Sequence, residues 1–129
     1  MDNALSQKQA LQTILVVDDE ANNISILNEI LQNKFQILFS LNGPDAINLC
    51  EKYKPDLILM DIIMPDMSGY EVCKILKNNP KTAEIPIIFI SALEYAQDKL
   101  KGLEVGGVGY IAKPFEVEEV QACINKYIA

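Results

Sequence analysis

Apolar residues along the chain fall into short continuous runs separated by longer segments with helical spacing. The run Leu57–Met60 is apolar at every position. This pattern is typical of a central parallel strand, because helices cover both of its faces. Similar runs at Ile14–Val17 and Ile87–Ile90 predict two more strands, and shorter ones are predicted at Ile37–Phe39 and Val108–Ile111.

Between these runs, apolar residues recur three or four positions apart, which predicts amphipathic helices. The helical positions are Ile24, Leu27, Ile30 and Leu31; Ala46, Ile47, Leu49 and Cys50; Val72, Ile75 and Leu76; and Val117, Val120, Ile124 and Tyr127, with one further helix at Glu94–Leu103. Pro44 could open the second helix. Ser68 and Glu71 have the spacing of a capping box for the third. Five successive strand–helix repeats predict a doubly wound α/β fold.

The domain is predicted to begin near Thr13 and to span residues 13–129, with residues 1–12 as an N-terminal tail. A chain of 129 residues has room for one domain only. No window approaches 18 uninterrupted apolar residues, and Met1-Asp2-Asn3 lacks the basic, apolar start of a signal peptide. We therefore expect a soluble protein of the cytoplasm.

The charge and the cysteine content exclude several classes of function. A net charge of −7 disfavours direct nucleic-acid binding, which depends on Lys and Arg contacts to phosphate. Cys50, Cys73 and Cys123 are widely spaced within predicted helices, so we interpret them as small buried side chains rather than disulfides. The sequence has no histidine, which removes Ser-His-Asp and Cys-His catalysis and the usual zinc ligands.

Side chains suited to phosphoryl chemistry stand at or just after the ends of four predicted strands. They are Asp18 and Asp19, Asp61, Ser91 and Lys113. The carboxyl ends of parallel strands share one edge of a sheet, so these groups are predicted to converge there. Clustered carboxylates repel one another unless a hard divalent cation and an ammonium offset their charge. The arrangement predicts a site for Mg²⁺ and a phosphoryl group.

Each of these residues also has a purely structural interpretation. Asp18 and Asp19 could be an acidic pair at a helix N-terminus, and Ser91 could cap the helix after it together with Glu94. Asp61 is harder to explain in this way, because it lies between apolar residues where an idle carboxylate would be costly to desolvate. We assign Asp61 as the nucleophile, Asp18 and Asp19 as metal ligands, and Lys113 as the cationic partner of Asp61 or phosphate.

These residues stand in four motifs that together resemble the receiver domain of two-component response regulators. The motifs are Ile14–Glu20, Asp56–Gly69, Ile90–Ala92 and Lys113–Phe115, and the resemblance covers about Thr13 to Ile128. It implies a flavodoxin-like fold with five helices and a five-stranded parallel sheet in the order 2-1-3-4-5. A domain of this kind catalyses only its own phosphorylation and dephosphorylation.

The resemblance also implies the roles of individual residues. Asp61 would be the phosphoacceptor, and Mg²⁺ would be bound by Asp18, Asp19, Asp61 and the backbone carbonyl of Ile63. Ser91 and Lys113 would engage the phosphoryl group. Ser91 and Tyr110 would form the switch, with an ordinary half-buried strand tyrosine as the less favoured interpretation of Tyr110. A cis peptide bond between Lys113 and Pro114 is implied as well.

The implied partners are a histidine kinase or a histidine phosphotransfer protein as phosphoryl donor, and an output domain or protein whose identity the sequence leaves open. A homodimer through the fourth helix, fifth strand and fifth helix is a further expectation of the family. Whether the chain stands alone or belongs to a larger regulator is also left open.

Two departures from the family pattern carry predictions. The run Gly106-Gly107-Val108-Gly109 is unusually rich in glycine and could loosen the approach to the last strand. Ile63 and Leu93 are apolar at positions where the family often has polar residues. We hypothesise that they shield the phosphorylated site from water and lengthen its lifetime.

Three other classes of function compete with a phosphorylated receiver. A phosphatase of the haloacid dehalogenase type would need a second Asp at position 63, where this chain has Ile63. Nucleotide hydrolases need a GxxxxGK[ST] loop, which the sequence lacks. The remaining alternative is a receiver-like interaction module that is never phosphorylated.

Overall fold

The computed structural model describes residues 11–92 and 96–128, which form five strands and five helices in strict alternation. The elements are β1 (Thr13–Val17), α2 (Ala21–Leu31), β2 (Gln36–Ser40), α3 (Gly43–Tyr53), β3 (Leu57–Asp61), α4 (Gly69–Lys77), β4 (Ile87–Ser91), α5 (Ala96–Glu104), β5 (Gly109–Ala112) and α6 (Val117–Asn125). The predicted start of the helix at Glu94 lies outside the described residues. The other predicted strands and helices are confirmed, with small shifts at their ends.

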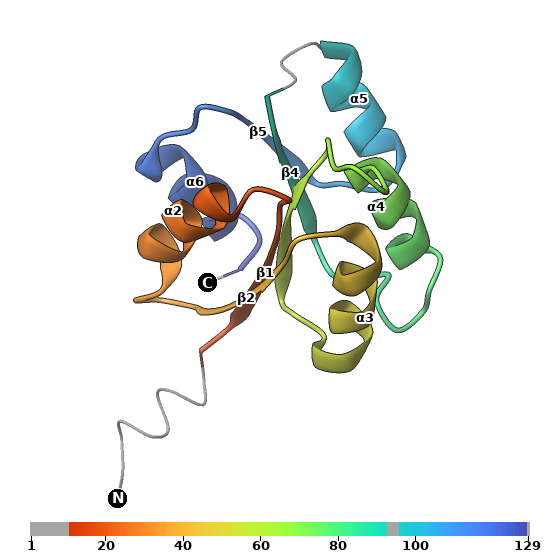
Figure 1. Ribbon diagram of the computed structural model, residues 1–129, viewed down its shortest axis with the longest axis horizontal. Coiled ribbons are helices and arrows are strands. Elements are labelled where there is room, and N and C mark those ends of the chain that lie inside the picture. The colour runs from red at the N-terminus through yellow and green to blue at the C-terminus, as the bar shows by residue number, and fades with distance from the viewer. Residues whose placement is uncertain (1–10, 93–95, 129) are drawn as a thin grey trace, which may run out of the picture.

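All strand pairs are parallel, and the strand order is β2-β1-β3-β4-β5. The predicted doubly wound fold and its strand order are therefore confirmed. Helices α2 and α6 cover one face of the sheet, and α3, α4 and α5 cover the other (Figure 1). This layering explains the apolar runs, because neighbouring residues of a strand point to opposite faces and both faces are buried. In β3, Leu57 and Leu59 pack on the α2 and α6 side, whereas Ile58 and Met60 pack on the other.

Local capping interactions fix where the helices begin. The Ser68 side chain accepts a hydrogen bond from the Glu71 backbone, and the Glu71 carboxylate accepts one from the Ser68 backbone. This reciprocal pair confirms the predicted capping box of α4. Asn42 caps α3 by accepting from the Asp45 amide at 2.8 Å, with Pro44 in the first turn. These caps orient both helices against the same face of the sheet.

Three predicted helix-face positions are not in the core. Ile75 and Val117 are exposed, although Leu76 and Val120 on the same helices are buried. Tyr127 lies beyond the end of α6, and its hydroxyl donates to the Val108 carbonyl at 2.7 Å. Helical spacing alone assigned these residues to the buried face. In the structure, the part of each helix that contacts the sheet is narrower than its apolar face. The cysteines follow the prediction more closely, since all are free, with Cys50 and Cys73 buried and Cys123 partly buried.

The glycine-rich approach to β5 is closely packed. Gly106 has φ +108°, which favours glycine. The Gly107 amide donates to the Gly102 carbonyl at 2.8 Å, and a Cβ on Gly107 would collide with the ring of Phe89. The glycines thus let this turn lie against the buried strand β4. None of the described helices combines the length and apolar content needed to cross a membrane.

Candidate functional site

The parallel register brings the predicted site residues to the carboxyl edge of the sheet. Asp18 follows the last residue of β1, and Asp61 and Ser91 are the last residues of β3 and β4. Lys113 follows β5, and its amide donates to the Ser91 carbonyl at 2.8 Å. A cavity of about 210 Å³ opens at this edge. It is lined by Asp19, Glu20, Asp61, Ile63, Ser91, Ala92 and Lys113.

The Lys113 ammonium joins the two buried carboxylates of the site. Its Nζ atom lies 3.0 Å from Oδ2 of Asp18 and 3.5 Å from Oδ2 of Asp61. Burial favours the neutral amine, but the hydrogen bond to Asp18 and the charges of both carboxylates outweigh it, so the pKa of Lys113 is raised. The predicted pairing with Asp61 is present, and the shorter contact with Asp18 was not anticipated. Lys113 therefore remains a cation that partly offsets two negative charges.

Hydrogen bonds hold the Asp18 side chain in place. Its Oδ1 accepts from the Glu20 amide at 2.9 Å, and its Oδ2 accepts from the Asn23 side chain at 3.2 Å and from Lys113. Its own amide donates to the Ser40 carbonyl at the end of β2 at 3.1 Å. These contacts satisfy a carboxylate that is only 3% exposed. Asp18 is thus a buried carboxylate whose orientation in the site is fixed by hydrogen bonds.

The Asp61 carboxyl is destabilised in its charged form. Burial and the nearby charge of Asp18 raise its pKa from 3.8 to about 6, although Lys113 and a backbone hydrogen bond from Ile63 work in the opposite direction. A cation entering the site would relieve this penalty directly. The charged form of Asp61 would therefore be stabilised by a cation bound beside it.

The exposed carboxylates at the rim extend the acidic cluster. Oxygen atoms of Asp18, Asp19 and Glu20 all lie within 4.8 Å of one another, in a group that does not include Asp61. Glu20 was not among the predicted site residues, although its position directly after Asp18 and Asp19 in the sequence is a usable signal. An all-oxygen donor set fits a hard cation such as Mg²⁺. Asp18, Asp19, Asp61 and the Ile63 carbonyl remain the predicted ligands, with Glu20 beside them.

The remaining predicted residues differ in how close they lie to the cavity. Ser91 is fully buried at the cavity wall, while its proposed capping partner Glu94 and the shielding residue Leu93 lie outside the described residues. Ile63 is 57% exposed at the rim. The peptide bond between Lys113 and Pro114 is cis, as the resemblance implied.

Tyr110 lies away from this cavity. It is partly buried on β5, packs on the α3 and α4 side of the sheet, and has the Lys99 ammonium 5.8 Å from its ring centroid. This position agrees with the half-buried strand tyrosine of the structural interpretation. The switch role of Tyr110 therefore stays a prediction.

Comparisons with known proteins agree with this fold and show its family. Residues 14–125 match the family of the response regulator receiver domain. A probable cyclic di-GMP phosphodiesterase of Vibrio cholerae is 36% identical over 90% of this chain, and the match covers 26% of that protein. The chain spans about a quarter to a half of the length of the first curated relatives that it matches.

Solved structures show the same architecture. The chemotaxis protein CheY4 of Vibrio cholerae superposes with a TM-score of 0.88 at 25% identity, covering 92% of this chain and all of that one. The receiver domain of a Pseudomonas aeruginosa sensor histidine kinase gives a TM-score of 0.85 at 28% identity, covering 92% of this chain and 98% of that one. That neighbour holds a magnesium ion in its active-site cleft. With the family match over most of its length, this chain belongs to the response regulator receiver domain family.

Proposed function

We propose that Asp61 accepts a phosphoryl group from a partner's phosphohistidine in a Mg²⁺-dependent reaction. The observation that carries this proposal is the buried Asp61 carboxylate, which lies beside Asp18 and 3.5 Å from the Lys113 ammonium. Because the given chain has no histidine, the donor imidazole lies outside it, and we propose a histidine kinase or a histidine phosphotransfer protein as its source. The cytoplasm is the proposed compartment, and direct contact with nucleic acid is disfavoured by the negative charge.

In the proposed transfer, a carboxylate oxygen of Asp61 forms a bond to phosphorus as the P–N bond of the donor breaks. The electron pair of that bond returns to the imidazole nitrogen. Lys113 offers N–H donors to the incoming oxygens, and the Ser91 hydroxyl offers one more. When bound, Mg²⁺ offsets charge on the carboxylates and the phosphoryl oxygens. Asp18, Asp19, Asp61 and the Ile63 carbonyl would hold it.

The consequence we propose is a switch in a partner-binding face. Phosphorylation changes the charge that Lys113 and Ser91 contact, and Ser91 is the last residue of β4. Its neighbour across the sheet is Ala112, two residues after Tyr110. In this proposal, a shift of Ser91 is transmitted along β5 to Tyr110 and from there to an output domain or protein. A homodimer through α5, β5 and α6 remains a family expectation.

Incubation with acetyl phosphate and Mg²⁺ is expected to give a single phosphoryl adduct, measured as intact mass. Chelation of the metal should abolish the adduct, because the carboxylates then repel the incoming phosphoryl group. Asp61→Asn should also abolish the adduct. Asp66→Asn is its matched control and should still give the adduct, since it removes only an exposed carboxylate from the loop after β3. The absence of any adduct, under conditions that label a known receiver, would support the unphosphorylated interaction module instead.

Polar replacements at Ile63 and Leu93 are expected to shorten the lifetime of the phosphorylated form several-fold. The exposed Ile63 side chain stands at the rim of the cavity, where it would limit the approach of water to the acyl phosphate. The rate of adduct loss after removal of acetyl phosphate measures this effect. Ile75→Asn is the control for adding an exposed amide elsewhere, and an unchanged rate in the Ile63 and Leu93 double variant would refute the shielding hypothesis.

A further inference from the structure

The outer edge of β2 has no strand beside it in the described part of the chain. β2 pairs with β1 only, and it is the first strand in the sheet order. The Gln36 amide and the Ser40 carbonyl both bond toward the β1 side. Because successive residues of a strand alternate in direction, Ile37 and Phe39 turn their N–H and C=O groups outward. This edge presents backbone donors and acceptors in a row.

The edge lacks the features that normally keep such strands from pairing. Proteins protect edge strands with charged residues, prolines or bulges. The segment Gln36–Leu41 has neither a charge nor a proline. The register with β1 continues over all five residues of β2, which excludes a bulge. Among residues 11–92 and 96–128, the edge is therefore regular and open to another strand.

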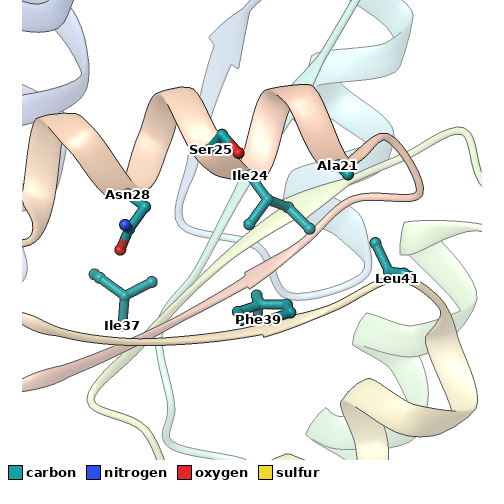
Figure 2. A pocket seen from close by; sticks show the side chains of 7 residues that line it. All are labelled: Ala21, Ile24, Ser25, Asn28, Ile37, Phe39 and Leu41. Carbon is teal, nitrogen blue, oxygen red and sulfur yellow. The ribbon is translucent and has the colours of Figure 1, made fainter.

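An apolar cavity of about 330 Å³ lies between this edge and α2. Figure 2 shows Ile24 of α2 facing Ile37 and Phe39 of β2 across it. Phe39 is 61% exposed and Leu41 is 48% exposed, and in the strand between Gln36 and Ser40 only Ser40 is fully buried. The molecule thus presents a protruding aromatic ring next to a cavity on the same surface.

Charge favours a second copy of this chain as the occupant. The whole chain carries −7, yet the cavity is lined only by uncharged residues. These are Ala21, Ile24, Ser25, Asn28, Ile37, Phe39 and Leu41. A charged partner would find no opposite charge here, whereas a second copy brings the same uncharged lining to the contact. An outward strand edge is also complementary to itself when two copies run antiparallel.

We propose that two copies of the chain associate through antiparallel pairing of their β2 edges, about a two-fold axis at Leu38. Ile37 of each copy then exchanges both backbone hydrogen bonds with Phe39 of the other. Ile37 and Phe39 point to the α2 side, so each Phe39 ring packs against Ile37 of the other copy, over its cavity. Aromatic and β-branched side chains are favourable cross-strand neighbours. The two sheets become one continuous sheet.

Sedimentation velocity over a wide range of protein concentration tests the proposal. The unmodified chain should show a monomer–dimer equilibrium, and Phe39→Asp should raise the dimer Kd by about tenfold or more, because it places two carboxylates in the contact. Ile75→Asp is the matched control for an exposed apolar residue on α4 and should leave Kd unchanged. Leu103→Asp on α5 should also leave it unchanged, which separates this dimer from the family's expected one. Thermal melting of each variant verifies that it folds.

Amide hydrogen exchange followed by NMR tests the same contact without any substitution. The amides of Ile37 and Phe39 should gain protection as concentration rises, while the amide of Leu38, which faces β1, should not. Added salt should strengthen the dimer, because it screens the repulsion between two chains of charge −7. Three results would overturn the proposal: a monomer at every concentration, a dimer lost with Leu103→Asp instead of Phe39→Asp, or a dimer that forms only after deletion of residues 1–10.

Discussion

Asp61→Asn is expected to stabilise the metal-free protein at pH 7 by about 1–3 kcal/mol while abolishing the phosphoryl adduct. Asparagine keeps the shape of the side chain but removes a charge that burial and Asp18 disfavour. The lost ion pair with Lys113 works against this gain, although that ammonium keeps its 3.0 Å contact with Asp18. The free energy of unfolding in urea with a chelator present measures the first effect, and intact mass measures the second.

The stability difference should depend on pH with a defined sign. The pKa of Asp61 is raised from 3.8 to about 6 by folding, so the folded protein binds this proton more tightly than the unfolded chain does. The protonated Asp61 carboxyl makes its full contribution to the free energy of unfolding below about pH 4. That contribution is lost as the pH rises through about 6. The advantage of Asp61→Asn should therefore appear between pH 4 and 6 and stay constant at higher pH.

A matched control and the metal sharpen this experiment. Asp66→Asn removes an exposed carboxylate and should leave stability nearly unchanged over the same range. Added Mg²⁺ should stabilise the unmodified protein by mass action and stabilise Asp61→Asn much less, because a ligand has been lost. An Asn variant that is less stable than the unmodified protein at pH 7 would contradict the electrostatic account of the site.

Gly69→Ala is expected to destabilise the fold by about 3 kcal/mol and to weaken phosphorylation with it. Gly69 opens α4, and its amide donates to the Ile62 carbonyl at 2.8 Å. A Cβ at this position would collide with the backbone carbonyl oxygen of Asp61 and stand 3.0 Å from Cα of Ile62. Both obstacles are backbone, so the α4 terminus or the end of β3 must move.

Gly109→Ala provides the comparison for Gly69→Ala. Its added Cβ would lie 3.3 Å from the Cys123 sulfur and 3.4 Å from a side-chain carbon of Ile88, which are contacts that side chains can adjust. We expect it to cost about 1 kcal/mol or less. Urea unfolding of the two variants in parallel measures the difference. Equal losses for both would show that the close approach to Asp61 is not what requires glycine at position 69.

The fold could be predicted from the sequence because its signals are local and repeated. The all-apolar run of β3 indicated a strand buried on both faces, and Ser68 with Glu71 indicated where α4 begins. The convergence of Asp18, Asp61 and Lys113 followed from the shared edge of a parallel sheet. Which carboxylate takes the shorter contact with Lys113 depends on side-chain positions, and no spacing in the sequence contains that information.

The errors have a common physical cause. Ile75, Val117 and Tyr127 continue a helical repeat, but a helix end or a narrow contact with the sheet decides which repeats are buried. The exposure of Phe39 could not be predicted from the sequence either, because an apolar edge strand and an apolar central strand have similar composition. Sequence periodicity reports which residues share a face, while exposure depends on what else in the chain reaches that face.

The uncharged edge of β2 has a consequence for the solubility of the protein and its dependence on pH. At neutral pH the chains repel one another over a Debye length, so an unprotected strand meets its equivalent only at close range. Near the isoelectric point of about 4.5 that barrier disappears, while the backbone groups of Ile37 and Phe39 keep their full capacity to pair. Mild acid should therefore bring the protein to its lowest solubility, with strand-to-strand growth beginning at this edge.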